Sequence, residues 1–244
     1  MLAKPFSPSI QPLYAWALGL LTAALLAPPA SAQTFSKNFQ VSPDASEIEI
    51  TNQTGSIKVT AAEHSNRVVI NAKQSAADAE IKAKQTSEGK VKVEVTGLAA
   101  VDLELTVPAT SKLDLLCYKC AITVANVNGS VRARTMDGGI VFTGLRSPRV
   151  EAHSTSGDVN FAGELLPRGD YKLKSFAGRV DVTLPASADF KLLASSFRAA
   201  MDLGSFPLKF SKQSAQMVEG ACGEGRATML LWTQEGSLHL HRKP

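Results

Sequence analysis

Residues 131–142 read VRARTMDGGIVF, and residues 150–161 read VEAHSTSGDVNF. Both stretches place small or apolar residues at alternate positions, then a short polar stretch that contains glycine, then alternate apolar residues again. Alternation with a period of two is typical of a β-strand with one buried face. The polar stretch has the residue preferences of a β-turn. Each stretch therefore predicts two short strands joined by a corner.

The same twelve-residue pattern recurs seven times along the chain. Counted from a pivot that is usually glycine, small or apolar residues occupy positions −7, −5, +2 and +4, and a small polar residue usually occupies −3. The pivots are Gly55, Cys120, Gly138, Gly157, Gly178, Ala199 and Gly236. From residue 120 to residue 199 they are spaced by 18 to 21 residues, so one pattern and a short connection make one rung. A single rung cannot bury its apolar side alone, so we expect the rungs to stack.

Stacked rungs predict an all-β protein, a β-solenoid or β-helix-like stack of short strands. A β-sandwich built from hairpins is the alternative. Tight hairpins favour Gly or Asn at the two central turn positions, but these positions hold Tyr118-Lys119 and Met136-Asp137. We therefore favour a coil, in which Phe142 lies over Phe161 and the small polar residues at −3 form a ladder along one corner. Helix should be scarce, and residues 76–84, its best candidate, read equally well as strand.

The pattern also divides the chain. Residues 1–32 have the features of a secretory signal peptide: Lys4, an apolar stretch over residues 13–27, and the small residues 30–32 before a cut at Gln33. An uncleaved membrane anchor is the alternative, but the apolar run is shorter than the roughly 20 residues that a span needs. Residues 33–111 carry only partial patterns and predict a less regular β-region, and residues 112–244 form the strand repeat region. We expect an exported protein, periplasmic or at the cell surface, with no membrane span after cleavage.

The charge balance argues against one class of partner. The chain has 26 Lys and Arg residues against 22 Asp and Glu, a net charge of +4. The basic residues are scattered along the chain and are not interleaved with aromatics, which is unlike a nucleic-acid-binding surface. We therefore expect no nucleic-acid partner. The oligomeric state does not follow from the composition.

Several segments resemble one known family. IEITNQTGSIKV at residues 48–59, VEAHSTSGDVNF at 150–161 and VEGACGEGRATMLLWTQEGSLHLHR at 218–242 are similar, in order and number, to the exported bacterial proteins with DUF4097 repeats, which are often described as adhesins. The resemblance covers nearly the whole chain after residue 32. It implies a β-solenoid-like envelope protein without catalytic residues to carry over. The sequence departs from the family pattern at Cys120 and Ala199, where glycine is preferred, and at Cys117, where Ser or Thr is preferred.

The three cysteines offer several arrangements. Cys117 and Cys120 lie in one corner, and a turn brings residues i and i+3 within about 7 Å, close enough for a disulfide. A structural disulfide is favoured in an oxidising compartment, because a redox-active pair would need a helix N-terminus in an α/β fold. Cys222 occupies an interior position, either as a buried thiol or paired with one of the other two. A zinc site of three cysteines and a histidine is a further alternative.

Two polar surfaces complete the set of candidates. Asp158, Arg179, Asp181 and Asp202 occupy outward positions of neighbouring rungs and form a weak candidate face. Paired carboxylates there could serve glycoside hydrolysis, but outward residues of any solenoid are charged for solubility. His239 and His241 alternate on the last strand and face outward together, and a metal site would need a third ligand from another rung. We therefore predict no catalytic residue, no metal and no cofactor.

These patterns favour a non-catalytic cell-envelope protein, an adhesin-like structural or binding module whose partner is an envelope polymer or another protein. A polysaccharide-acting enzyme on a β-helix scaffold is the first alternative. A partner of an envelope-stress signalling system is the second. Most patterned positions serve the core, so the sequence indicates the architecture more strongly than the ligand.

Overall fold

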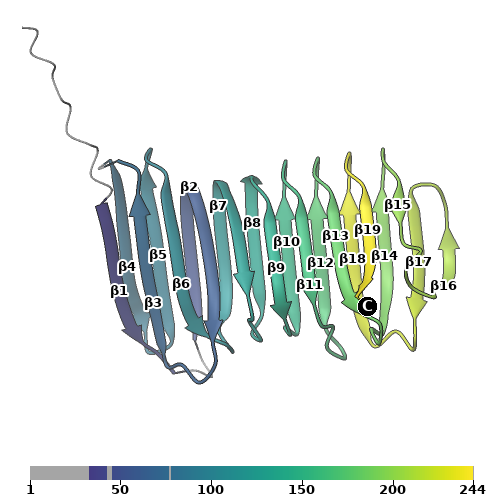
Figure 1. The fold of residues 1–244 in the computed structure, drawn as a ribbon, viewed down its shortest axis with the longest axis horizontal. Helices are drawn as coiled ribbons and strands as arrows, with labels where there is room; N and C mark the ends of the chain where they lie inside the picture. Colours follow the sequence, from purple (N-terminus) through teal and green to yellow (C-terminus); the bar gives the residue numbers. More distant parts are fainter. Residues whose placement is uncertain (1–32, 43–45, 77, 244) are drawn as a thin grey trace, which may run out of the picture.

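The computed structural model describes residues 33–42, 46–76 and 78–243. They form 19 β-strands in one continuous hydrogen-bonded sheet, folded into two faces that enclose the core (Figure 1). The faces are joined because β2 (Glu47–Ala62) and β7 (Lys112–Ala125) run through the corner without a break and contribute one half to each face. This is the all-β solenoid that the repeated pattern predicts.

The first face contains strands that precede the corner in each rung. In spatial order these are β4 (Ala79–Ser87), β5 (Lys90–Gly97), the first halves of β2 and β7, β8 (Val131–Asp137), β10 (Arg149–Ser154), β12 (Asp170–Ser175), β18 (Ala227–Thr233), β14 (Phe190–Ser196), β17 (Met217–Cys222) and β16 (Lys209–Gln213). From β5 to β14 neighbouring strands are parallel, whereas the pairs at both ends of this face are antiparallel.

The second face contains strands that follow the corner. In spatial order these are β1 (Gln33–Gln40), β3 (Arg67–Gln74), β6 (Val101–Pro108), the second halves of β2 and β7, β9 (Ile140–Leu145), β11 (Val159–Gly163), β13 (Val180–Pro185), β19 (Leu238–Lys243) and β15 (Met201–Asp202). Phe142 pairs with Phe161 in register, as the stacking of rungs predicts. Their rings meet edge to face at 6.5 Å between centroids.

A ladder of hydroxyl groups holds the corner between the two faces. The side chain at −3 donates a hydrogen bond to the pivot carbonyl of the preceding rung: Ser154 to Gly138 at 2.9 Å and Ser175 to Gly157 at 2.8 Å. The same hydroxyl accepts the N–H of its own pivot, as Ser175 does from Gly178 at 2.9 Å. Equivalent bonds to the neighbouring rung of the stack are made by Thr135, Thr233 and Ser196. The ladder satisfies polar groups that would otherwise be buried without partners.

The rungs do not stack in the order of the chain. β2 lies between β5 and β7 on the first face, and β18 lies between β12 and β14. The final strands of the described chain are therefore inserted into the stack, and β16 and β17 occupy its end (Figure 1). The corner pattern specifies which side chains point inward. It does not specify which rung lies next to which, because every corner presents the same groups.

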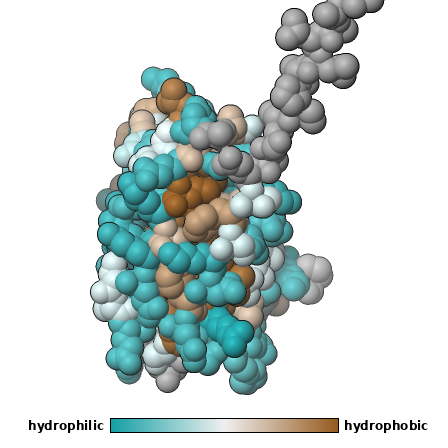
Figure 2. Space-filling view, turned by 90° about the vertical axis from the view of Figure 1, so that its left-hand side faces the viewer, coloured by the Kyte–Doolittle hydropathy of each residue, from teal (hydrophilic) through white to brown (hydrophobic). Residues whose placement is uncertain are grey.

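The end of the stack formed by β1 and β4 shows an apolar patch with a polar surround (Figure 2). Phe35 and Phe39 on β1 and Ile81 on β4 are half-buried and pack against the core. Lys37 reaches across this end, because its Nζ donates to the carbonyl of Ala83 at 2.6 Å and lies 5.1 Å from the centre of the Phe39 ring. The lysine thus links the two faces where the regular stack ends.

Residues 79–87, which overlap the best candidate for a helix, form strand β4. The predicted signal peptide, residues 1–32, lies outside the described residues. Within the residues that the structure describes, no helix is long and apolar enough to cross a membrane.

Candidate functional site

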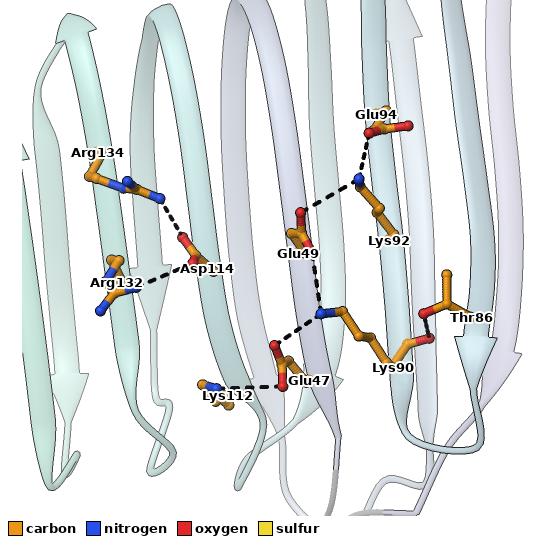
Figure 3. A network of polar contacts seen from close by, with 10 residues as sticks. All are labelled: Glu47, Glu49, Thr86, Lys90, Lys92, Glu94, Lys112, Asp114, Arg132 and Arg134. Atoms are coloured by element: carbon orange, nitrogen blue, oxygen red, sulfur yellow. Dashed lines mark hydrogen bonds and ion pairs between the residues drawn. The ribbon is translucent and has the colours of Figure 1, made fainter.

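The outer surface of the first face changes character along the stack. From β5 to β8 it carries a network of ion pairs (Figure 3). Lys90 contacts both Glu47 and Glu49, and Asp114 lies between Arg132 and Arg134. A hydrogen bond from Lys92 lowers the pKa of Glu94. Acidic and basic groups neutralise one another there, which is typical of a soluble surface.

Beyond this network the first face becomes apolar. A groove of about 550 Å³ lies over β10, β12, β18 and β14. We call it the aromatic groove, and its lining residues are His153, Thr155, Lys174, Phe176, Leu193, Ser195, Leu230 and Trp232. The rings of Phe176 and Trp232 lie 6.4 Å apart between centroids and are tilted by 49°. Its size and its mixture of apolar walls with a few polar groups match those of ligand-binding clefts.

The parallel register builds this groove from residues that are far apart in the sequence. Lys174 pairs with His153 on one side and with Trp232 on the other. Leu230 pairs with Leu193. Because β18 is inserted between β12 and β14, the outward side chains of the last part of the chain lie between two earlier rungs. The groove therefore depends on the unexpected stacking order.

Large exposed apolar side chains also lie at the corner, although Thr155 and Gln234 occupy the same position in two intervening rungs. Tyr118, Met136, Phe176 and Phe197 all occupy position −2 of their rungs, and each is between 40% and 57% exposed. We call these four residues the apolar ridge. A solenoid does not need apolar residues at these outward positions for its core. Exposed apolar groups gathered along one edge are typical of an interaction surface.

The weak candidate surface of Asp158, Arg179, Asp181 and Asp202 lies on the second face of the solenoid, across the core from the aromatic groove. Arg179 brings two of its aspartates together: its backbone N–H donates to Asp158 at 2.8 Å, and its Nε lies 2.7 Å from Asp181. Asp202 lies apart, because β19 separates β15 from β13. Three of the four residues thus form one ion-pair cluster, and the arginine occupies carboxylate oxygens that catalysis would use.

A carboxylate lies beside the histidine pair, at the place where a metal site would need its third ligand. His239 and His241 stack in parallel with 5.9 Å between ring centroids. Asp181 of the neighbouring strand offers a carboxylate oxygen, and the donor atoms of all three residues lie within 4.8 Å of one another. This is a geometry that the sequence alone did not show, because it depends on the insertion of β19 beside β13.

Cys117 and Cys120 lie in the corner of β7 with their Cα atoms 5.8 Å apart and their sulfur atoms paired. That separation is usual for a disulfide. Cys222 is a buried free thiol, and burial raises its pKa. A raised pKa disfavours the thiolate, the form that reacts or binds metals.

The sequence motifs do not single out most residues of the aromatic groove. Their signal lies at position −6, which points outward. It holds Arg132, Glu151 and Lys172 in three rungs but Leu193 and Leu230 in two others. A change from charged to apolar residues at an outward position marks a surface that solubility does not explain.

Comparison with known proteins identifies the family to which this chain belongs. The two-faced solenoid with a hydroxyl and glycine corner defines a class of β-strand repeat proteins. Residues 47–241 match the model of the Toastrack DUF4097 family, so the chain belongs to that family. No protein of curated function matches the sequence.

Two solved structures are similar to this chain at low sequence identity. A "putative cell adhesion protein" from Clostridium sporogenes is 12% identical, with a TM-score of 0.50, over 86% of this chain and 100% of that one. A "putative adhesin" from Bacteroides fragilis is 10% identical, with a TM-score of 0.39, over 88% of this chain and 99% of that one. The similarity to the first supports the fold assignment alone.

Proposed function

We propose that this protein is an exported, non-catalytic binding module of the cell envelope, with an adhesin-like role. The observation that carries the proposal is the change along the first face from a neutralised network of ion pairs to an aromatic groove, whose residue Phe176 also belongs to the apolar ridge. Rigid strands hold both surfaces in register. A stack of this kind presents a long surface to an extended partner.

The groove favours a polymer with both apolar and hydroxyl groups, and a glycan of the envelope is the class that fits best. The rings of Phe176 and Trp232 offer apolar surface on which a sugar ring can stack. His153, Lys174 and Ser195 among the lining residues offer hydrogen-bonding groups. With few charges in the groove, we expect a neutral or weakly acidic polymer.

Export is supported by the pattern of residues 1–32 and by a pair of cysteines placed for a structural disulfide. The "putative cell adhesion protein" of similar fold agrees with a surface role. Fractionation of cells followed by N-terminal sequencing tests this part. We expect recovery in the envelope or external fraction with Gln33 as the first residue. Recovery in the cytosol with an intact leader would contradict it.

A pull-down from envelope fractions and a glycan panel tests binding. We expect retention of a polymer by the native protein and loss of most retention in the Phe176→Ala, Trp232→Ala double variant. Phe210→Ala is the matched control, since Phe210 is exposed but lies on β16, away from the groove. Equal retention by all three proteins would refute the groove as the binding surface.

The same panel tests the absence of catalysis. We expect no new reducing ends after long incubation. Product formation that disappears in the Asp158→Asn, Asp181→Asn variant would establish an enzyme on the second face instead.

A further inference from the structure

We propose that Asp181, His239 and His241 form a binding site for a divalent transition-metal ion on the outer surface of the second face. The proposal does not depend on the aromatic groove, which lies on the other face. It rests on two histidines of one strand and an aspartate of the neighbouring strand whose donor atoms lie within 4.8 Å of one another.

The backbone fixes the three side chains on one surface. His239 and His241 are two residues apart on β19, so both point outward while Leu238 and Leu240 are buried. Asp181 on β13 pairs directly with His239 in a parallel register. All three ligands therefore come from regular strands, which hold a site more precisely than loops do.

The contacts around the three side chains suit metal coordination. Arg179 holds one carboxylate oxygen of Asp181, with its Nε 2.7 Å from Oδ2. The other oxygen, Oδ1, lies 3.9 Å from Nε2 of His241. The arginine thus orients the carboxylate and leaves one oxygen available on the side of the histidines, as outer groups do around known metal ligands.

The histidine rings have to turn to coordinate one ion together. They stack with 7° between their planes and 5.9 Å between centroids, and rotation of the side chains brings their in-plane nitrogen lone pairs to converge. Nε2 of His239 lies 2.9 Å from the hydroxyl of Ser237. A hydroxyl that accepts a ring proton leaves the other ring nitrogen with its lone pair, the form that binds metal.

The donor set points to the class of ion. Imidazole nitrogen with a single carboxylate suits Zn²⁺, Cu²⁺ and Ni²⁺, whereas Ca²⁺ and Mg²⁺ prefer sites of oxygen ligands. Around a tetrahedral ion with bonds of about 2.0 to 2.2 Å, donor atoms lie roughly 3.4 Å apart. The 3.9 Å between His241 and Asp181 requires a small side-chain rotation to reach that spacing. With three protein ligands, at least one coordination position stays open to water or to a group on a partner.

Calorimetric titration of the full chain, prepared without a histidine tag, tests the proposal. The probes are Zn²⁺, Cu²⁺ and Ni²⁺ as simple salts, with Mg²⁺ for comparison. We expect one ion bound per chain for the transition metals and no binding of Mg²⁺. His241→Gln should weaken the affinity roughly tenfold or more, because loss of even an outer partner costs that much. Asp181→Asn should also weaken the affinity for the metal ion.

His153→Gln is the matched control, because it also removes one histidine but on the other face. We expect its affinity to equal that of the native protein. Cu²⁺ gives a second readout: its electron paramagnetic resonance spectrum should show coupling to two imidazole nitrogens in the native protein and to one in His241→Gln. Absence of binding to all three transition metals, or equal affinity in His241→Gln and His153→Gln, would overturn the proposal. A Cys222→Ser variant that lost the binding would also overturn it, since the thiol would then be the ligand.

Discussion

The hydroxyl of Ser175 donates a hydrogen bond of 2.8 Å to the carbonyl oxygen of Gly157 in the preceding rung. It also accepts the N–H of Gly178 in its own rung at 2.9 Å. One buried side chain thus satisfies two backbone groups and links two rungs at the corner. The same arrangement recurs along the stack, and it gives the repeated pattern its physical basis.

Ser175→Ala removes both of these hydrogen bonds. We expect the free energy of unfolding to fall by about 1 to 3 kcal/mol, the cost of leaving buried polar groups unsatisfied. Urea denaturation measures the change. Ser156→Ala is the matched control, because Ser156 lies in a neighbouring corner but is exposed, and its loss should cost less than about 0.5 kcal/mol. Equal losses in the two variants would contradict a stabilising role for the ladder.

The pivot glycines allow close approach of neighbouring rungs. A Cβ atom at Gly157 would collide with the carbonyl oxygen of Gly138. At Gly139 the nearest atom would be the carbonyl oxygen of Asp158 at 3.4 Å, an ordinary contact. We therefore expect Gly157→Ala to lower the free energy of unfolding by about 2 kcal/mol or more. Gly139→Ala should change it by less than about 0.5 kcal/mol. Similar melting curves for the two variants would show that the rungs do not pack this closely.

Mass spectrometry tests the disulfide between Cys117 and Cys120. Under denaturing conditions without reduction, we expect alkylation of one cysteine, Cys222. After reduction, all three should react. Three alkylations without reduction would show that no bridge forms. The double Cys→Ser variant should lose about 2 kcal/mol of stability, because the bridge closes a very short loop.

Asp189 links two turns at the end opposite the corner. The backbone N–H of Arg226 donates to its carboxylate at 2.8 Å, and the guanidinium contacts it at 2.6 Å. These bonds lower the pKa of Asp189 from 3.8 to about 2. A folded-state pKa below the unfolded value contributes stability above the unfolded pKa, and this contribution is lost as the pH falls through the folded one.

The consequence is measurable with Asp189→Asn. We expect the native protein to be more stable than the variant near neutral pH. The difference should shrink as the pH falls from about 4 to about 2, where the carboxylate becomes protonated. Denaturant midpoints across this range measure it. A difference that does not change with pH would contradict the assigned ion pair.

Much of the fold follows from the sequence, and the site does not. Alternation around the pivots predicts the strands, and Ser154 and Ser175 at −3 predict the corner ladder. This pattern does not encode the order of stacking. Thr233 donates a hydrogen bond to the carbonyl of Gly178, but the hydroxyl at −3 of another rung could make the same bond. The aromatic groove and the cluster of Asp181, His239 and His241 both depend on that order. The outward leucines at −6 and the outward Phe176 at −2 give an advance signal for the groove.

Trp232 provides the most direct test of the proposed function. The only other tryptophan, Trp16, precedes the predicted cut, so the chain from Gln33 onward has a single fluorescent tryptophan, located in the aromatic groove. Titration with envelope glycan fragments should give a saturable change in its emission, which Phe176→Ala weakens and Phe210→Ala leaves unchanged. An emission spectrum that stays constant while calorimetry records binding of the same fragments would contradict the groove as the recognition surface.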